Sequence, residues 1–165
     1  MTAFSHHGHR LRRDIIPVIG HPEYFLVRLR NGRGQRKLKK IETAKSDPDR
    51  RPFKVDFEIR RKLRARGSKG FGKPLKFTPK RSKWNRWDLV VKIKKASRYL
   101  HRLVGLSATP LCTDTRGFEV EPRFITKEEA SLFEVHHPGD DNKQCTADAL
   151  HVLFKEYHRS LRRGA

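Results

Sequence analysis

Residues 53–59 read FKVDFEI, and this stretch decides the fold that we expect. Apolar and polar residues alternate along it without a break, which is typical of a β-strand with one buried face. Phe53, Val55, Phe57 and Ile59 share that face in such a strand. Four large apolar side chains on one short strand predict that it anchors the hydrophobic core.

The next stretch, residues 59–87, reads IRRKLRARGSKGFGKPLKFTPKRSKWNRW and is named the basic segment. It carries twelve Lys and Arg residues and no acidic one. Its glycines and prolines interrupt regular structure, so we expect a long loop. Like charges repel one another, and the interspersed Phe and Trp residues suit a polyanion that carries bases as well as phosphates. A solvated basic loop is the simpler alternative.

The charge of the chain is concentrated in its centre. The 165 residues have a formal net charge of +21, which points to nucleic acid or another anionic surface as the partner. Residues 28–102 hold 28 basic and 6 acidic residues, whereas residues 103–165 hold 8 and 10. The last third is therefore suited to something other than phosphate.

No motif indicates an enzyme, and we expect no reaction, no cofactor and no small-molecule substrate. P-loop, dinucleotide-binding, zinc-protease and nucleophile-elbow motifs are missing from the sequence. Cys112 and Cys145 lack the spacing of a zinc site, and the tail histidines 6, 7 and 9 have no carboxylate at ligand spacing. No apolar run reaches the roughly 18 residues that a membrane-spanning helix needs. The Arg-containing start faintly resembles a mitochondrial presequence.

Several further elements are expected before and after residues 53–59. Residues 23–30 alternate as a strand, followed by turn residues at 31–34. Residues 14–21 are expected to be irregular, and residues 35–50 to form an inserted loop. The spacing of Leu89, Ile93, Ala96, Leu100 and Leu103 predicts a helix capped by Asn85; the alternative is a strand over 89–93 with a helix only from Ser97.

The two tryptophans and the C-terminal third leave alternatives open. Trp84 and Trp87 would pack in the core or stack on bases. A capping box at Thr126 predicts a helix that ends at Pro138-Gly139, and Thr146 caps a second helix with an apolar stripe of Leu150, Leu153, Phe154, Tyr157 and Leu161. Leu153, Phe154 and Tyr157 either dock on a neighbouring protein or cover the chain's own core.

Short motifs in residues 23–106 resemble the bacterial-type small-subunit ribosomal protein 16 family in its mitochondrial form. The similar stretches are Val27–Gly32, Arg51-Pro52-Phe53, Arg60–Gly67 with Phe71, Phe77-Thr78-Pro79, Asp88-Leu89, Ser97 and Leu103–Leu106. Residues 33–50 are longer than the family's turn, and the Gly-Ala pair expected before Ser97 is missing. The resemblance implies a small α+β domain that organises small-subunit ribosomal RNA and performs no reaction.

Together these observations predict an α+β fold: a small mixed sheet with one or two packed helices, a long basic loop and a helical C-terminal extension. The expected divisions are an N-terminal extension (1–22), an RNA-binding core (23–106) and a C-terminal extension (107–165). The expected function is that of a structural constituent of the mitochondrial ribosome, in the matrix. Its expected partners are ribosomal RNA and, through the C-terminal helices, neighbouring ribosomal proteins. A large-subunit ribosomal protein, a DNA-compacting protein or an RNA-processing factor is the alternative.

We expect the RNA to be contacted by cations of the central half and by one tryptophan. These residues are Arg28, Arg30, Arg33, Arg36, Lys37, Arg51, Arg60, Arg61, Lys62, Arg64, Arg66, Lys69, Lys73, Lys76, Lys80, Arg81, Lys83, Trp84 and Arg86.

Overall fold

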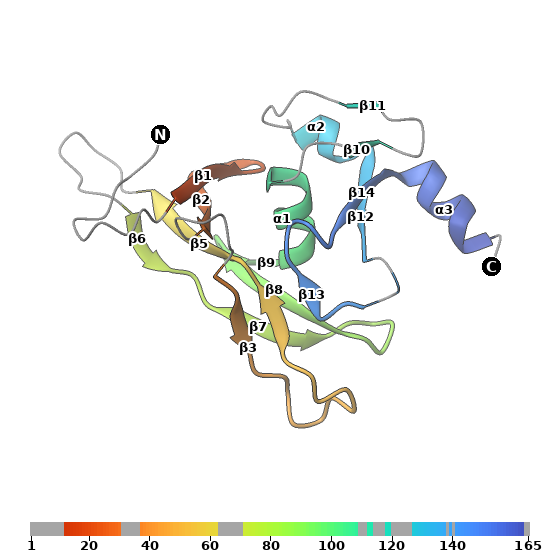
Figure 1. Cartoon of the computed structure of the whole chain (residues 1–165), viewed down its shortest axis with the longest axis horizontal. Coiled ribbons are helices and arrows are strands. Elements are labelled where there is room, and N and C mark those ends of the chain that lie inside the picture. The colour runs from red at the N-terminus through yellow and green to blue at the C-terminus, as the bar shows by residue number, and fades with distance from the viewer. Residues whose placement is uncertain are drawn as a thin grey trace.

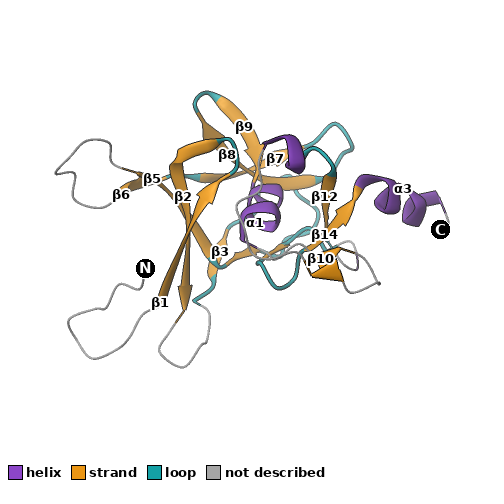
Figure 2. Ribbon diagram, turned by 90° about the horizontal axis from the view of Figure 1, so that it is seen from above, coloured by secondary structure: helices purple, strands orange, loops and turns teal. Residues whose placement is uncertain are grey.

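The computed structural model describes residues 12–30, 37–62, 71–108, 112–113, 118–119, 127–137, 139 and 141–163. Within this part the fold is α+β, with strands in several small sheets and three helices (Figures 1 and 2). The elements are β1 (Arg12–Val18), β2 (His21–Arg30), β3 (Lys39–Ile41), β4 (Phe53–Val55), β5 (Phe57–Lys62), β6 (Phe71–Pro74), β7 (Phe77–Arg81), β8 (Trp87–Ile93), β9 (Ala96–Tyr99), α1 (Leu100–Ala108), β10 (Cys112–Thr113), β11 (Phe118–Glu119), α2 (Lys127–Ala130), β12 (Phe133–His136), β13 (Gln144–Cys145), β14 (His151–Phe154) and α3 (Lys155–Arg163).

The larger sheets follow the chain closely. Strands pair in the order β1-β2-β5-β6 in one sheet and β7-β8-β9 in another, and every pair in them is antiparallel. A third sheet, β13-β4-β3, joins distant parts of the sequence, because β13 runs parallel to β4. β12 pairs with β14, and β10 with β11.

Helix α1 lies in the middle of these sheets (Figures 1 and 2). It packs against β1, β8, β9 and β12. Leu100 and Val104 are fully buried, as expected of a helix that is covered on several sides. At Gly105 an added Cβ would lie only 2.6 Å from Cγ2 of Val135, so the absence of a side chain permits the close approach of β12.

The prediction for residues 53–59 is confirmed in its buried face. Phe53, Val55, Phe57 and Ile59 are at most 1% exposed and belong to the main core. The strand is interrupted at Asp56, so that β4 and β5 join different sheets. One Asp56 carboxylate oxygen, Oδ1, accepts the backbone N–H of Ala147 at 3.4 Å, which ties this break to the C-terminal third.

The helix expected from residue 85 is wrong, and the alternative is closer. Residues 87–93 form β8 and residues 96–99 form β9, so the helix begins only at Leu100. Asn85 has a positive φ of 61° in a turn and caps no helix. β-Branched Val90 and Val91 favour the strand, in which Leu89, Val91 and Ile93 share a buried face.

The C-terminal helices are shorter than expected. α2 ends at Ala130 after four residues, and the chain continues as β12 instead of reaching Pro138. The second apolar stripe is divided between strand β14 and helix α3. The register of β12 with β14, which places Val135 opposite Val152, explains the change: pairing with a neighbouring strand prevails over the local helical periodicity.

The N-terminal residues also differ from expectation. Residues 12–18 form edge strand β1, where Pro17 is tolerated beside a register shift, and Gly20 adopts the positive φ (69°) that the turn to β2 requires. β3 lies within the expected loop of residues 35–50. Among the described residues, the core cluster includes residues from Val18 to Val152. The turn expected at 31–34 lies outside the described residues.

Candidate nucleic-acid interface

The basic segment is not a single loop. Residues 59–62 complete β5, residues 71–74 form β6, and residues 77–81 form β7. In Figure 1, β6 lies at the left and β7 below the centre of the molecule, whereas α3 lies at the right. The segment therefore presents cations from two β-hairpins, β5–β6 and β7–β8.

The β7-β8-β9 sheet has one apolar and one polar face. Its inner face buries Phe77, Leu89, Val91 and Ile93. Because cross-strand partners share a face, the row Thr78–Val90–Tyr99 and the pairs Lys80–Asp88 and Lys92–Ser97 define the outer face. Lys80 and Lys92 are exposed, and Tyr99 is 44% exposed. This outer face combines separated cations with an aromatic ring.

A tight loop closes the β7–β8 hairpin and carries more charge. Lys83 and Trp84 are at its centre, and Lys83 Nζ lies 5.0 Å from the centroid of the Trp84 ring. Arg81 donates a hydrogen bond to Asn85, and Arg86 Nη2 lies 3.2 Å from Oδ1 of the buried Asp88. Trp84 is 79% exposed, so core packing is wrong for this residue, whereas Trp87 packs against the core.

The β5–β6 hairpin adds a second group of cations. Arg61 and Lys73 are exposed, whereas Arg60 is half-buried and forms an ion pair with Glu58. Lys76, which is exposed, lies between β6 and β7. Arg61 and Lys73 are therefore the stronger phosphate-binding candidates on this hairpin.

Some expected RNA-binding residues are engaged within the protein. The guanidinium carbon of Arg28 lies 5.7 Å from the centroid of the Phe57 ring. Arg51 is held between Asp49 at 2.8 Å and Asp141 at 3.3 Å, and its hydrogen bonds lower the pKa of Asp49 to about 2. Because the two carboxylates already balance its charge, Arg51 is a weaker candidate for phosphate.

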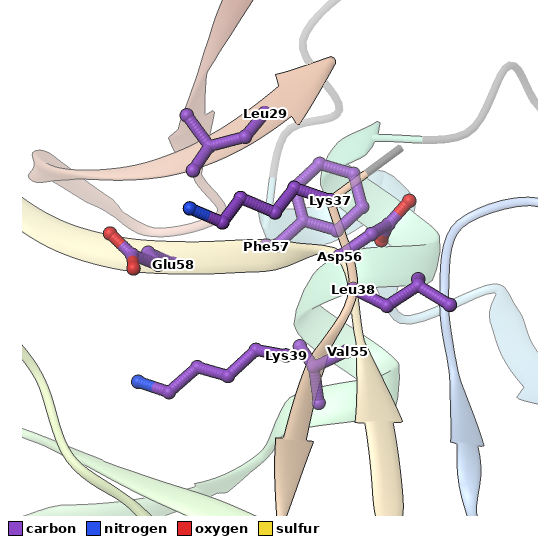
Figure 3. Close-up of a pocket in the computed structure, with 8 residues that line it drawn as sticks. All are labelled: Leu29, Lys37, Leu38, Lys39, Val55, Asp56, Phe57 and Glu58. Carbon is purple, nitrogen blue, oxygen red and sulfur yellow. The ribbon is translucent and has the colours of Figure 1, made fainter. Parts of the chain in front are cut away.

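Lys37 lies at a small cavity of about 170 Å³ between β2, β3 and β5 (Figure 3). The lining includes Lys39 as well as the carboxylates of Asp56 and Glu58. In Figure 3 the amino groups of both lysines lie on the same side as the Glu58 carboxylate. The cavity is therefore balanced in charge, and it does not concentrate positive charge as the two hairpins do.

Other expected residues lie outside the described part. These are Arg33, Arg36, Arg64, Arg66 and Lys69, together with the side chains of Arg30 and Lys62.

The structure adds candidates that the sequence reasoning missed. Lys92, Lys95, Arg98 and Tyr99 are exposed on or beside the β7-β8-β9 sheet. They were assigned to a helix, which would have distributed them around its surface. The strand alternative for residues 89–93 contained the signal that could have found Lys92, because it separates Val90 and Lys92 from the buried residues.

The residues expected to dock on a protein do not form one exposed stripe. Leu153 is 8% exposed, and Tyr157 is half-buried. The Phe154 ring lies 4.7 Å from that of Phe133. The exposed apolar residues of this region are Phe154 (39%) and Leu161 (44%). Leu153 is therefore buried within the chain, whereas Phe154 is exposed.

Three titratable groups differ in charge from the surface cations: half-buried His101 and buried His137 and Cys145. Burial lowers the pKa of His101 to about 3 and of His137 to about 4, and it raises the pKa of Cys145 to about 12. All three groups are thus uncharged at neutral pH. Among the described residues, no three His, Cys, Asp or Glu side chains gather as a metal site would require, and no helix is long and apolar enough to cross a membrane.

The surface thus has two cationic β-hairpins, one of which carries the exposed Trp84 ring and pairs with β9, the strand that carries Tyr99. Such a surface can hold phosphates through Lys and Arg and can stack bases on its rings. No protein-family model, no curated protein and no solved structure matches this chain.

Proposed function

We propose that the chain is a structural RNA-binding protein of a ribosome, and more specifically of the small subunit of the mitochondrial ribosome. In this role it binds and organises ribosomal RNA in the mitochondrial matrix and catalyses no reaction. The resemblance of residues 23–106 to the small-subunit protein 16 family supports the specific form of the proposal.

The observation that carries the proposal is the outer face of the β7-β8-β9 sheet with its hairpin loop. It presents Lys80, Lys83 and Lys92 together with the exposed rings of Trp84 and Tyr99. Cations interspersed with flat rings favour a partner that has both phosphates and accessible bases. Folded RNA offers both, whereas the bases of a DNA duplex are stacked on one another.

Charge and shape together favour a structural role. Many weak phosphate contacts supply affinity, while A-form RNA hides its deep major groove from side chains and is recognised mainly by shape. A contact with a neighbouring ribosomal protein is proposed for the opposite side, at α3, where Leu161 is exposed.

Salt dependence and competition test the proposal. Binding of the full chain to a structured RNA is expected to weaken about a thousandfold between roughly 50 and 200 mM salt if six or more phosphates are neutralised. Duplex DNA of equal length serves as the competitor. An affinity that is nearly independent of salt would contradict a phosphate-binding role, and equal binding to duplex DNA would favour the DNA-compacting alternative.

Sedimentation tests the ribosomal part of the proposal. The native protein is expected to sediment with the small ribosomal subunit of mitochondria at moderate salt and to leave it at high salt. Sedimentation with the large subunit, or at the position of the isolated protein, would overturn the assignment to the small subunit.

A further inference from the structure

The loop that joins β7 to β8, residues 82–86, is held in one conformation by its own hydrogen bonds and is named the tip loop. The Ser82 N–H donates to the Arg86 carbonyl at 2.7 Å, and the Asn85 N–H donates to the Ser82 carbonyl at 3.0 Å. The Ser82 hydroxyl oxygen accepts the N–H groups of Trp84 and Arg86, both at 3.3 Å. The backbone that carries Trp84 is therefore fixed before any ligand binds.

Trp84 is far more exposed than the fold requires. It is 79% exposed, the highest value among the exposed large apolar side chains of the described residues. Trp87, three residues later, packs against the core. An indole is among the largest apolar surfaces that a side chain can bury. Trp87 therefore contributes to the packing of the core, whereas Trp84 remains exposed to solvent.

The surroundings of Trp84 are cationic. Lys83 places its ammonium group over the ring, 5.0 Å from the centroid. Lys80 and Arg81 precede the tip loop on β7, and both are exposed. The nearest acid in the sequence, Asp88, is buried and paired with Arg86. With Lys83 over one face of the ring, the opposite face is left for a flat ligand.

We propose that Trp84 stacks on a single unpaired base of the bound RNA, while Lys80, Arg81 and Lys83 contact the flanking phosphates. This inference rests on the proposed function and names the RNA feature that the site takes. A base inside an A-form helix has both faces covered by its neighbours, so an isolated ring can stack only on a bulged, looped or terminal base. One ring at the end of a tight loop accommodates one such base.

Three RNA hairpins of the same stem sequence test the inference. The first is fully paired, the second has one unpaired adenosine, and the third has an abasic site at the position of that adenosine. Because stacking of one base on an aromatic ring contributes about 1–3 kcal/mol, the wild-type chain is expected to bind the second hairpin about 5- to 160-fold more tightly than the third.

Substitutions assign this preference to the ring. Trp84→Ala is expected to abolish the preference for the adenosine over the abasic site, and Trp84→Phe to retain part of it. Trp84→Leu keeps apolar bulk but has no flat ring, so it should behave as the alanine variant does. Leu132→Ala removes another exposed apolar side chain, 57% exposed in the turn after α2, and should leave the ratio unchanged.

Fluorescence provides a second measurement. The chain has two tryptophans, so Trp87→Phe leaves Trp84 as the only one. Its emission is expected to be quenched by the hairpin with the unpaired adenosine and not by the abasic hairpin.

The outcomes separate the inference from the proposed function. If the wild-type chain binds all three hairpins equally, the stacking inference is overturned and the RNA-binding function stands. If it binds none of them, the proposed function itself fails. The comparison of the three hairpins with the wild-type chain decides the matter even if a Trp84 variant folds poorly.

Discussion

The β7-β8-β9 sheet and the two-stranded β12-β14 sheet both pack on α1, yet their outward residues differ in chemistry. Outward residues of the first include Lys80, Lys92 and Tyr99. On the second, the Glu134 carboxylate forms a hydrogen bond with Nδ1 of His158 from α3, and His158 Nε2 lies 3.3 Å from His136 Nδ1. Since successive side chains of a strand point to opposite faces, burial of one face leaves the residues of the other face open to different chemistry. The first unit presents mainly cations, whereas Glu134 and His136 of the second both contact His158 within the chain.

The comparison also shows how firmly the C-terminal third belongs to the fold. Lys143, just before β13, forms a buried ion pair with Asp47 and lies 4.0 Å from the centroid of the Phe53 ring. Gln144 then pairs with Lys54 of β4. These contacts hold residues 141–152 to the strand that anchors the core.

The largest expected effect follows from breaking the Asp47–Lys143 pair. Both side chains are at most 4% exposed, and hydrogen bonds from Lys143 and Thr43 lower the pKa of Asp47 although burial alone would raise it. Asp47→Asn leaves a buried ammonium group without its carboxylate, which typically costs about 3–5 kcal/mol. Urea denaturation at neutral pH measures the loss.

Two controls separate this pair from charge removal in general. Asp49→Asn removes an exposed carboxylate two residues away and should change the stability little. The double variant Asp47→Leu with Lys143→Met, which has no buried charge, should be more stable than Asp47→Asn. If Asp47→Asn and Asp49→Asn destabilise equally, the buried pair does not hold the C-terminal third in place.

The second largest expected loss of stability concerns the contact between α1 and β12. Gly105→Ala places a methyl group against Val135, and overpacking of this kind costs about 1–3 kcal/mol. Val135→Ala makes room for that methyl group. A double-mutant cycle by denaturation should therefore show that Gly105→Ala is less harmful in the Val135→Ala background. Additive effects would mean that helix and strand do not press on each other here.

An element could be predicted from the sequence where its hydrophobic pattern fits only one type of secondary structure. The alternation of apolar and polar residues at 53–59 does not fit a helix, and the buried face of this stretch was predicted correctly. Residues 89–103 fit both a helix and a strand, because Leu89 and Ile93 are four apart and also share parity with Val91. The deciding feature is the two-residue turn at Lys94 and Lys95, whose φ values are 49° and 68°. Such a turn usually contains Asn or Gly, so the two lysines do not indicate a turn at this position.

The apolar stripe from Leu150 to Leu161 failed for a different reason. Residues 151–154 become a strand because residues 133–136 lie beside them, and that partner is remote from them in sequence. No local pattern contains this information.

The sequence predicted which types of residue make up the candidate site, but not the secondary structure that carries them. The basic segment is recognisable from its charge and its interspersed aromatic residues, because both are properties of the sequence that do not depend on the fold. Its division into two hairpins, and the different exposure of Trp84 and Trp87, depend on strand pairing and on the hydrogen bonds of Ser82. The contribution of Tyr99 required knowledge that β9 lies beside β8.

A smaller effect concerns pH and the histidines where α1 meets the C-terminal third. The rings of His101 and His137 lie 4.6 Å apart, and burial keeps both pKa values well below the ordinary 6.5. Below pH 6.5 the unfolded chain binds protons that the folded chain does not, so stability falls as the pH is lowered. Well below pH 6.5 and down to its folded pKa, each histidine lowers the free energy of unfolding by about 1.4 kcal/mol for each unit by which the pH falls.

The His101→Phe variant isolates one of these contributions. It keeps a flat ring and removes the titrating group, so between pH 6 and pH 5 it should lose about 1.2 kcal/mol less stability than the wild-type chain. Denaturation at the two pH values measures this difference. Parallel losses in both proteins would show that His101 is protonated in the folded state.

The smallest effect on stability comes from exposed cations, and it sharpens the contrast between the two sides of the molecule. Lys73, Lys76 and Lys80 lie on or between β6 and β7, whereas Lys127, Arg159 and Arg163 lie on α2 and α3 (Figure 1). Replacing either set with serine removes the same charge. Because isolated exposed charges contribute little, each triple variant should unfold within about 1 kcal/mol of the wild-type chain.

RNA binding should nevertheless separate the two triple variants. Each phosphate contact that is lost reduces the slope of log affinity against log salt by about one, so the β6–β7 variant should lose two to three units of slope. The α2–α3 variant should keep nearly the wild-type slope, since a change in net charge alone acts weakly at a distance when salt screens it. Equal losses in both variants would mean that affinity follows total charge, and that the position of the cations on the two hairpins has no special role.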